Sequence, residues 1–152
     1  MEIKIKAFDE LTPRELYSIL EARVRVFVVE QECAYQEVDN KDIHSHHVMM
    51  TNSVGELIGY TRLLPSGVAY DEPSIGRVLV DQSIRGTGLG KELMKASMKE
   101  MSDEWGVSSI RIQAQSYAKK FYEALGFIGF TDEYLEDDIP HVDMRWENKQ
   151  ES

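Results

Sequence analysis

A glycine-rich turn between an apolar run and a helix-like segment constrains the fold of this chain more than any other feature. The apolar run is Val78-Leu79-Val80, the turn is Arg85-Gly86-Thr87-Gly88-Leu89-Gly90, and the helix-like segment covers residues 91–105. Glycines let the backbone pass close to an anion because no Cβ is in the way, and the first N–H groups of a helix lack intrahelical acceptors. Such N–H groups can point at phosphate oxygens. The order of strand, turn and helix therefore predicts an α/β fold that binds a phosphorylated cofactor.

The spacing of the glycines separates this turn from two nucleotide-binding motifs. A dinucleotide-binding turn reads Gly-x-Gly-x-x-Gly, but the third glycine here, Gly90, comes one residue early. A P-loop ends in Gly-Lys followed by Ser or Thr, whereas Gly90 and Lys91 are followed by Glu92. Both patterns fail on specific residues, and a nucleotide-binding module of another kind stays open as an alternative.

Two motifs carry a resemblance to a known superfamily. The turn reads Arg-x-x-Gly-x-Gly and resembles the pyrophosphate-binding motif of the GNAT superfamily of acyl-CoA-dependent N-acetyltransferases. Residues 116–127 resemble a helix-and-turn pattern of the same superfamily, Ala-x-x-(apolar)-Tyr-x-x-x-Gly-Phe, which is matched here by Ala118, Phe121, Tyr122, Gly126 and Phe127. The two motifs stand in the order and at the separation that the superfamily shows. Residues 23–32, 37–42 and 134–141 further resemble its ElaA-like branch.

The resemblance and the hydrophobic periodicity together predict the fold. A chain of 152 residues is long enough for one domain. We expect a single α/β (α+β) GNAT-like domain, in which a central mixed, twisted sheet of about six to seven strands is flanked by about four helices. Residues 74–80 and 109–114 should form parallel strands that splay apart beyond the glycine turn. The domain should cover residues 1–147, followed by a polar tail at residues 148–152.

The expected elements follow from local patterns. Thr12-Pro13-Arg14-Glu15 is typical of a capping box at the start of a first helix, whose apolar stripe should include Ile19, Val24 and Phe27. Residues 30–45 lack periodicity and are expected to form an irregular crossing segment that shapes a binding site. The other expected helices cover residues 91–105 and 117–125, and the expected strands cover residues 3–7, 47–51, 56–64, 74–80, 109–114, 129–134 and 141–146.

The resemblance implies that acetyl-CoA is the cosubstrate. Backbone groups of Leu79 and Val80 would pair with its pantetheine arm, and N–H groups of the turn would hold its pyrophosphate. Gln115 stands where members of the superfamily often carry Asn, and its amide is included among the expected contacts. The residues implied to bind the cofactor are Leu79, Val80, Arg85, Gly86, Thr87, Gly88, Leu89, Gly90, Lys91 and Gln115.

The implied reaction is the direct attack of a neutral primary amine on the thioester. Tyr122 is the predicted general acid toward the departing sulfur, because the motif places its hydroxyl near the thioester and a reference pKa of about 10 keeps it protonated. A backbone N–H near Val80 would stabilise the oxyanion. An aliphatic ammonium with a pKa of about 10.4 must first lose a proton, so a proton acceptor or a water chain is required. His141 and Glu30 are the candidates, and His141 is favoured because histidine titrates near neutral pH.

No metal is predicted. His44, His46 and His47 lie near acidic residues, but their spacing matches no zinc pattern, and adjacent residues of a strand face opposite ways. The single cysteine, Cys33, has no partner for an internal disulfide and is expected to be a packed residue in a reducing compartment.

The net charge of −10 results from 17 Lys and Arg residues against 27 Asp and Glu residues. Such a chain repels polyanions, which argues against nucleic acid and anionic membranes as partners. Acidic residues cluster at positions 30–42 and 133–138, and most are expected to be solvated. If the two segments converge at the thioester site, they would attract a cationic acceptor.

We therefore expect a small-molecule or peptidic amine as the acceptor and a cytoplasmic location, and we leave a homodimer open. A function of another class also stays open. The chain would then be a catalytically inactive acyl-CoA-binding or regulatory domain that keeps the phosphate cradle without turnover.

Overall fold

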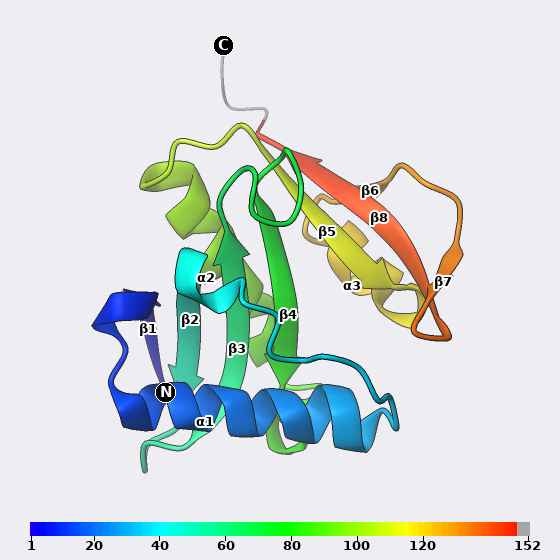
Figure 1. Ribbon diagram of the computed structural model, residues 1–152. Coiled ribbons are helices and arrows are strands. Elements are labelled where there is room, and N and C mark those ends of the chain that lie inside the picture. The colour runs from blue at the N-terminus through cyan, green and yellow to red at the C-terminus, as the bar shows by residue number, and fades with distance from the viewer. Residues whose placement is uncertain (149–152) are drawn as a thin grey trace.

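The computed structural model describes residues 1–148, and its centre is a twisted eight-stranded sheet with helices on both faces (Figure 1). The strand order is β1-β2-β3-β4-β5-β8-β6, with β7 paired to β8. Only β4 and β5 are parallel among the described strand pairs, so the expected mixed sheet with one parallel pair is confirmed. The strands are β1 (Glu2–Ala7), β2 (His46–Thr51), β3 (Leu57–Leu64), β4 (Ser74–Val80), β5 (Ser109–Gln115), β6 (Ile128–Gly129), β7 (Tyr134–Glu136) and β8 (Ile139–Glu147).

The helices are α1 (Pro13–Arg23), α2 (Leu89–Asp103) and α3 (Lys119–Glu123), together with the π-helix η2 (Val24–Glu30) and the short 3-10 helices η1 (Phe8–Glu10), η3 (Asp42–His44), η4 (Gln82–Ile84) and η5 (Ser116–Ala118). The helices of the described part of the chain are too short or too polar to traverse a lipid bilayer. The polar tail that the sequence predicts lies outside the described residues from position 149 onward.

The strand expected at residues 129–134 is divided into two short strands, β6 and β7, which accounts for the additional strand of the sheet. Strands β7 and β8 form a hairpin in which Glu136 pairs with Ile139. The turn residues Asp137 and Asp138 have φ angles of 51° and 62°. Aspartate tolerates this left-handed region better than most residues, so the hairpin can turn tightly without glycine.

Helix α1 begins as the sequence predicts and ends differently. The capping box is present: Thr12 Oγ1 accepts from the Glu15 N–H at 3.0 Å, and Glu15 Oε1 accepts from the Thr12 N–H at 2.9 Å. From Val24 onward the chain continues as a π-helix, whose wider turn rotates the side chains relative to an α-helix. The interpretation of Val24 as a core residue was wrong, because the buried side of the helix is the one that carries Ile19, Ala22, Arg23 and Val26. It is 39% exposed, whereas the preceding Arg23 is fully buried.

Two hydrophobic clusters fill the two faces of the sheet. Helix α2 buries Leu93, Met94, Met98 and Met101 against one face, so these methionines fill the core. On the other face, α1 and η2 pack on a smaller cluster that consists of Ile19, Ala22, Val26, Met49, Tyr60 and Leu79.

Strands β4 and β5 meet at one end only, through the pair Ser74 and Arg111. The Arg111 N–H donates to the Pro73 carbonyl at 2.9 Å at the same end, and beyond it the strands diverge (Figure 1). The pairing of β3 with β4 is also irregular, because its register shifts between Tyr60 and Arg62. Opposite that shift, Arg77 has a φ of 50°, which marks a bulge in the middle of β4. The splayed parallel pair that the sequence predicts is therefore present, and it opens a space at the centre of the sheet.

Candidate functional site

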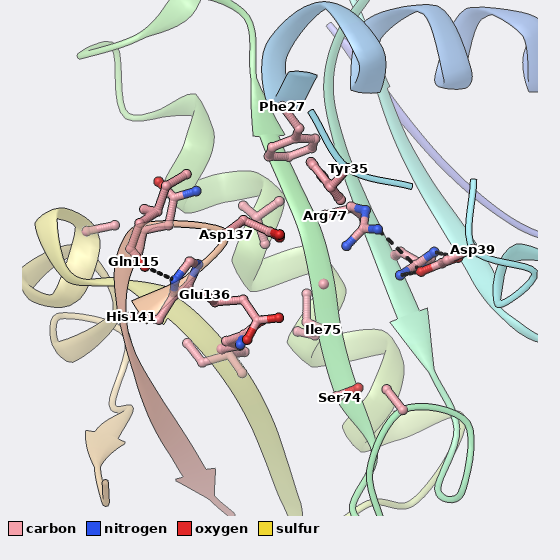
Figure 2. Close-up of a pocket in the computed structure, with 18 of the residues that line it drawn as sticks. Phe27, Tyr35, Asp39, Ser74, Ile75, Arg77, Gln115, Glu136, Asp137 and His141 are labelled. Carbon is pink, nitrogen blue, oxygen red and sulfur yellow. Dashed lines mark hydrogen bonds and ion pairs between the residues drawn. The ribbon is translucent and has the colours of Figure 1, made fainter. Parts of the chain in front are cut away.

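A cavity of about 580 Å³ lies where β4 and β5 diverge. Its walls come from segments far apart in the sequence: the crossing segment after η2, the two diverging strands, η5 with α3, and the β7–β8 hairpin. Figure 2 shows Phe27, Tyr35 and Arg77 on one side of this space and Gln115, Glu136 and His141 on the other. The expectation that residues 30–45 shape a binding site is consistent with this placement.

The glycine turn has the backbone geometry of a phosphate cradle. Gly86 and Gly88 have φ angles of 80° and 87°, and a Cβ at either position would meet nothing within 4 Å. Their conformation, and not close packing, therefore requires glycine. Gly90 differs, because its Cβ would lie 3.2 Å from Val80 Cγ2, so it serves the packing of α2 on β4.

The N–H groups of this turn divide into bonded and available ones. Thr87 N–H donates to the Ile84 carbonyl at 3.2 Å, and Leu89 N–H donates to Thr87 Oγ1 at 3.3 Å. Within residues 1–148, the amides of Gly86, Gly88 and Gly90 have no acceptor. Helix α2 starts directly after Gly88, so these amides lie at the positive end of its dipole. The cradle thus fits an anionic group such as the pyrophosphate of an acyl-CoA.

Arg85 links the cradle to β4 and to the end of η2. Its Nε donates to the Val80 carbonyl at 2.9 Å, and its Nη1 lies 2.6 Å from Glu30 Oε1. Glu30 is therefore held in an ion pair and is not among the residues that line the cavity. The two predicted bases are therefore not brought together, because His141 lines the cavity and Glu30 does not.

The backbone of Val80 faces the open side of β4. Asp81 N–H donates to the Ile58 carbonyl on β3 at 2.9 Å, and a trans peptide turns the preceding Val80 carbonyl the opposite way. In a strand the N–H and C=O of one residue point to the same side, so Val80 N–H also faces the gap. Leu79, by contrast, pairs with Tyr60 in the β3–β4 ladder, and its side chain is buried beneath α1.

Tyr122 lines the cavity from α3 and packs edge-on against Phe121 and Phe127, with ring centroids 5.1 and 6.0 Å apart. Burial, with a smaller contribution from Tyr117, raises the pKa of the Tyr122 hydroxyl above its ordinary value. The hydroxyl therefore stays protonated throughout the neutral range. It has no hydrogen-bond partner among the described residues, so it can donate to a bound molecule.

His141 also lines the cavity, stacked on Tyr134 with centroids 6.2 Å apart. Its Nδ1 lies 2.7 Å from the Ile139 carbonyl oxygen. Because a carbonyl only accepts hydrogen bonds, Nδ1 carries the proton, and Nε2 of the neutral ring carries the lone pair. No group of the described chain bonds to Nε2, so His141 has the tautomer of a proton acceptor. Gln115, opposite His141 in the β5–β8 ladder, donates from Nε2 to Gln31 Oε1 at 3.2 Å.

A buried charge network, which the sequence did not reveal, forms the wall beneath η2. Arg23 donates to Glu37 and Asp42 at 2.6 Å each, and Arg62 donates to Asp39 at 2.8 Å and to Asp42 at 3.0 Å. Arg77 completes the network, since its Nε lies 2.8 Å from Glu37 Oε2. The prediction that most of the clustered acids are solvated is confirmed for the others, which are exposed, but not for Glu37, Asp39 and Asp42, which are buried or nearly so and paired with arginines.

The network also fixes the ionisation of its members. Burial alone would raise the pKa of Asp39, but hydrogen bonds from Arg62 and the Lys41 N–H, and the charges of Arg62 and Arg77, lower it to about 2. Burial lowers the pKa of His47, whose Nε2 lies 3.0 Å from the Asp42 carbonyl and whose Nδ1 lies 2.6 Å from the Tyr60 hydroxyl. His47 is thus a neutral, hydrogen-bonded core residue. Residues 1–148 contain no group of three His, Cys, Asp or Glu side chains arranged to hold a metal ion.

The chain matches the model of the acetyltransferase (GNAT) domain family over residues 11–148. It is 42% identical to the UPF0039 protein of Schizosaccharomyces pombe over 148 residues, and this alignment covers 97% of each chain. It is 36% identical to protein ElaA of Escherichia coli over 138 residues, and this alignment covers 90% of each chain.

Solved structures agree with these similarities. The crystal structure of Escherichia coli ElaA superposes with a TM-score of 0.90 at 35% identity, over 97% of this chain and 100% of ElaA. An acyl-CoA N-acyltransferase from Pseudomonas aeruginosa superposes with a TM-score of 0.89 at 38% identity, over 96% of this chain and 99% of that chain. The resemblance that the two sequence motifs carry is therefore confirmed.

Proposed function

Because this chain belongs to the GNAT family of acetyltransferases, we propose that it transfers the acetyl group of acetyl-CoA to a primary amine that reaches the cavity as a cation. The family uses acetyl-CoA, whose thioester supplies an activated acyl group when it is bound. The observation that carries the proposal is the presence of two complementary groups on one cavity. Tyr122 offers an unbonded proton donor, and His141 offers an unbonded proton acceptor.

The cradle and the open side of β4 would hold the cofactor. The available amides of Gly86, Gly88 and Gly90 would bind the pyrophosphate, and Val80 would present its backbone groups to the pantetheine arm. The Val80 carbonyl is already bonded to Arg85 Nε, which leaves Val80 N–H as the group available to an oxyanion. Contacts of Gln115 and Lys91 with the cofactor remain predictions. Gln115 donates to Gln31 in this structure, and Lys91 is exposed on the first turn of α2.

The residues around the reaction site would then divide three tasks. His141 Nε2 would take the proton that the ammonium must lose, directly or through water. Val80 N–H would stabilise the negative charge on oxygen. The Tyr122 hydroxyl would donate a proton to the departing thiolate. Glu30 is the weaker candidate for the first task, because it is bound to Arg85 and lies off the cavity wall.

The acceptor would be attracted by the β7–β8 hairpin. Glu136 and Asp137 line the cavity there, and no ion pair joins either carboxylate to a described residue. The acids of residues 37–42 add little attraction, since Arg23, Arg62 and Arg77 balance them. A small-molecule or peptidic amine is therefore favoured by two carboxylates, not by both acidic segments of the chain.

Binding and turnover can be tested separately. Acetyl-CoA should raise the melting temperature, since a ligand at 100 times its dissociation constant stabilises a protein by about 2.7 kcal/mol, while ATP and NAD should not. A panel of primary amines should then release free thiol from acetyl-CoA. Binding of acetyl-CoA with no turnover on any amine would instead indicate a regulatory acyl-CoA-binding domain.

A further inference from the structure

The two walls of the cavity present different charged groups, and this difference indicates a feature of the acceptor beyond its amine. The β7–β8 wall carries two carboxylates and no cation. The carboxylates of this first wall are Glu136 and Asp137. The wall on β3, β4 and the crossing segment exposes three cations and one carboxylate to the cavity, namely Arg62, Arg77, Lys41 and Asp39. Behind it, Glu37 and Asp42 pair with the two arginines.

Arg77 is the cation best placed to meet a ligand. It lines the cavity, and Figure 2 shows its guanidinium between the labelled Tyr35 and Asp39. Its Nε is bound to Glu37 Oε2, and its Nη2 makes long contacts of 3.3 and 3.4 Å to Asp39 Oδ2 and the Glu37 carbonyl. Its Nη1 has no acceptor among the described residues, and the side chain is 21% exposed.

The backbone at Arg77 supports a functional role for this side chain. A φ of 50° is unusual for arginine and costs free energy, which persists only where the surrounding structure imposes it. The bulge re-aims the side chain relative to regular strand alternation, so that Arg77 joins the charge network and still reaches the cavity.

The floor beside Arg77 leaves room for a ligand. Gly76 lines the cavity in the middle of β4, where glycine weakens a strand. A Cβ there would make only ordinary contact, at 3.6 Å from Leu64 Cδ1, so packing does not require glycine. Two buried donors on the same wall, Ser74 Oγ and Arg62 Nε, have no hydrogen-bond partner within the described chain. This wall therefore holds more donors than acceptors.

We propose that the amine acceptor also carries a carboxylate, which lies over Gly76 and binds Arg77 Nη1, while its ammonium group faces Glu136 and Asp137. The acceptor would thus be an amino acid, or a peptide whose C-terminal residue carries the reacting amine on its side chain. A guanidinium N–H is a strong donor to a carboxylate, and the Ser74 hydroxyl can add a second bond by rotation about χ1. This inference rests on the proposed function, since it describes the second substrate of the same site.

The test compares amines that differ only by a carboxylate, such as lysine with cadaverine and ornithine with putrescine. Affinity for each is measured by calorimetry in the presence of coenzyme A, and kcat/KM is measured by thiol release. For the parent protein we expect roughly 10-fold to 100-fold tighter binding of the carboxylate member of each pair. Arg77→Gln should remove most of this preference. The matched control Arg25→Gln, which changes an exposed arginine paired with Glu21 and Asp81, should retain it.

Gly76→Ala gives a second variant if Arg77→Gln does not fold. It keeps every charge and adds a methyl group at the floor, so it should weaken the carboxylate members more than the decarboxylated ones. Equal binding of both members by the parent, or no binding of any of them, overturns the carboxylate site. Equal acetylation of both members would overturn it while supporting the acetyltransferase function. Selective binding of the carboxylate members without any acetylation would support the carboxylate site and overturn the acetyltransferase function.

Discussion

The two halves of the site are built in opposite ways. The cofactor side is a backbone structure, in which Gly86 and Gly88 leave amides without protein acceptors and space without side chains. The acceptor side is backed by a side-chain structure, in which the buried Arg23 binds the buried carboxylates of Glu37 and Asp42. We infer that the amides of the first half form their hydrogen bonds only when the ligand binds, whereas the side chains of the second half form theirs during folding. Substitutions in the cradle should therefore change ligand affinity, and substitutions at the buried members of the network, such as Arg23, should change stability.

Gly88→Val tests the cradle and has the largest expected effect on binding. Valine at a φ of 87° is strained, and its side chain would fill the approach of the pyrophosphate. We expect acetyl-CoA binding to fall below detection by calorimetry in a variant that remains folded. Gly55→Val is the control, because Gly55 has a φ of 85° and equally open surroundings in the turn between β2 and β3. If both variants bind acetyl-CoA alike, the cofactor does not use this turn.

Tyr122→Phe tests the chemistry next to the cradle. The ring and its contacts with Phe121 and Phe127 remain, and only the hydroxyl is lost. We expect kcat to fall roughly 10²-fold to 10⁴-fold, the usual range for loss of a general acid, with little change in acetyl-CoA affinity. Steady-state and single-turnover kinetics would measure this. A kcat within a factor of a few of the parent, with chemistry rate-limiting, would make Tyr122 a packing residue.

The same contrast explains how far the sequence could predict the molecule. The cradle was predictable because its residues are adjacent in the chain and stand between a strand and a helix. Tyr122 and His141 were predictable as candidates from the family resemblance, although their common cavity required the structure. The role of Arg23 was not predictable, because an arginine within an amphipathic helix usually faces solvent, and its partners Glu37 and Asp42 lie 14 and 19 positions away. The π-helical continuation at Val24 adds a rotation that a period of 3.6 residues does not contain.

Arg23→Met tests the network. It removes one partner and leaves Glu37 and Asp42 buried with fewer donors. Breaking a buried ion pair in this way costs roughly 3–5 kcal/mol of unfolding free energy, and we expect that loss in urea denaturation. Arg25→Met, two positions further along the chain, removes the ion pairs of an exposed arginine with Glu21 and Asp81 and should cost about 1 kcal/mol or less. A parent-like stability of Arg23→Met would mean that the network does not stabilise the fold, and would contradict the inference that it is formed during folding.

Acid should weaken the network in a defined order. His47 has a lowered pKa in the folded chain, so stability should begin to fall as the pH drops below about 6.5, where the unfolded histidine gains a proton. Asp39 has its pKa lowered to about 2, so its contribution is complete above about pH 4 and is lost as the pH falls toward 2. The protonation of Asp39 should lower the free energy of unfolding by about 2 kcal/mol.

Urea denaturation at a series of pH values measures both losses. Asp39→Asn should reduce the fall between pH 4 and 2, and Asp9→Asn, at an exposed aspartate of η1, should not. An identical acid profile for Asp39→Asn and the parent would show that Asp39 carries no linked stability.

The smallest expected effect concerns the one wall that is charged without being paired. Glu136 and Asp137 should attract a cationic amine over a distance comparable to the Debye length, which is about 8 Å at 0.15 M salt. The kcat/KM for the acceptor should therefore fall several-fold as ionic strength rises, while acetyl-CoA affinity is measured in parallel to separate the effect of salt on the cradle. Glu136→Lys or Asp137→Lys should reduce this salt dependence. Glu133→Lys is the matched control, since Glu133 is exposed outside the cavity. A salt dependence that is the same in all three variants and the parent would show that these carboxylates only keep the protein charged, and the acceptor half would then select its substrate through the β4 wall alone.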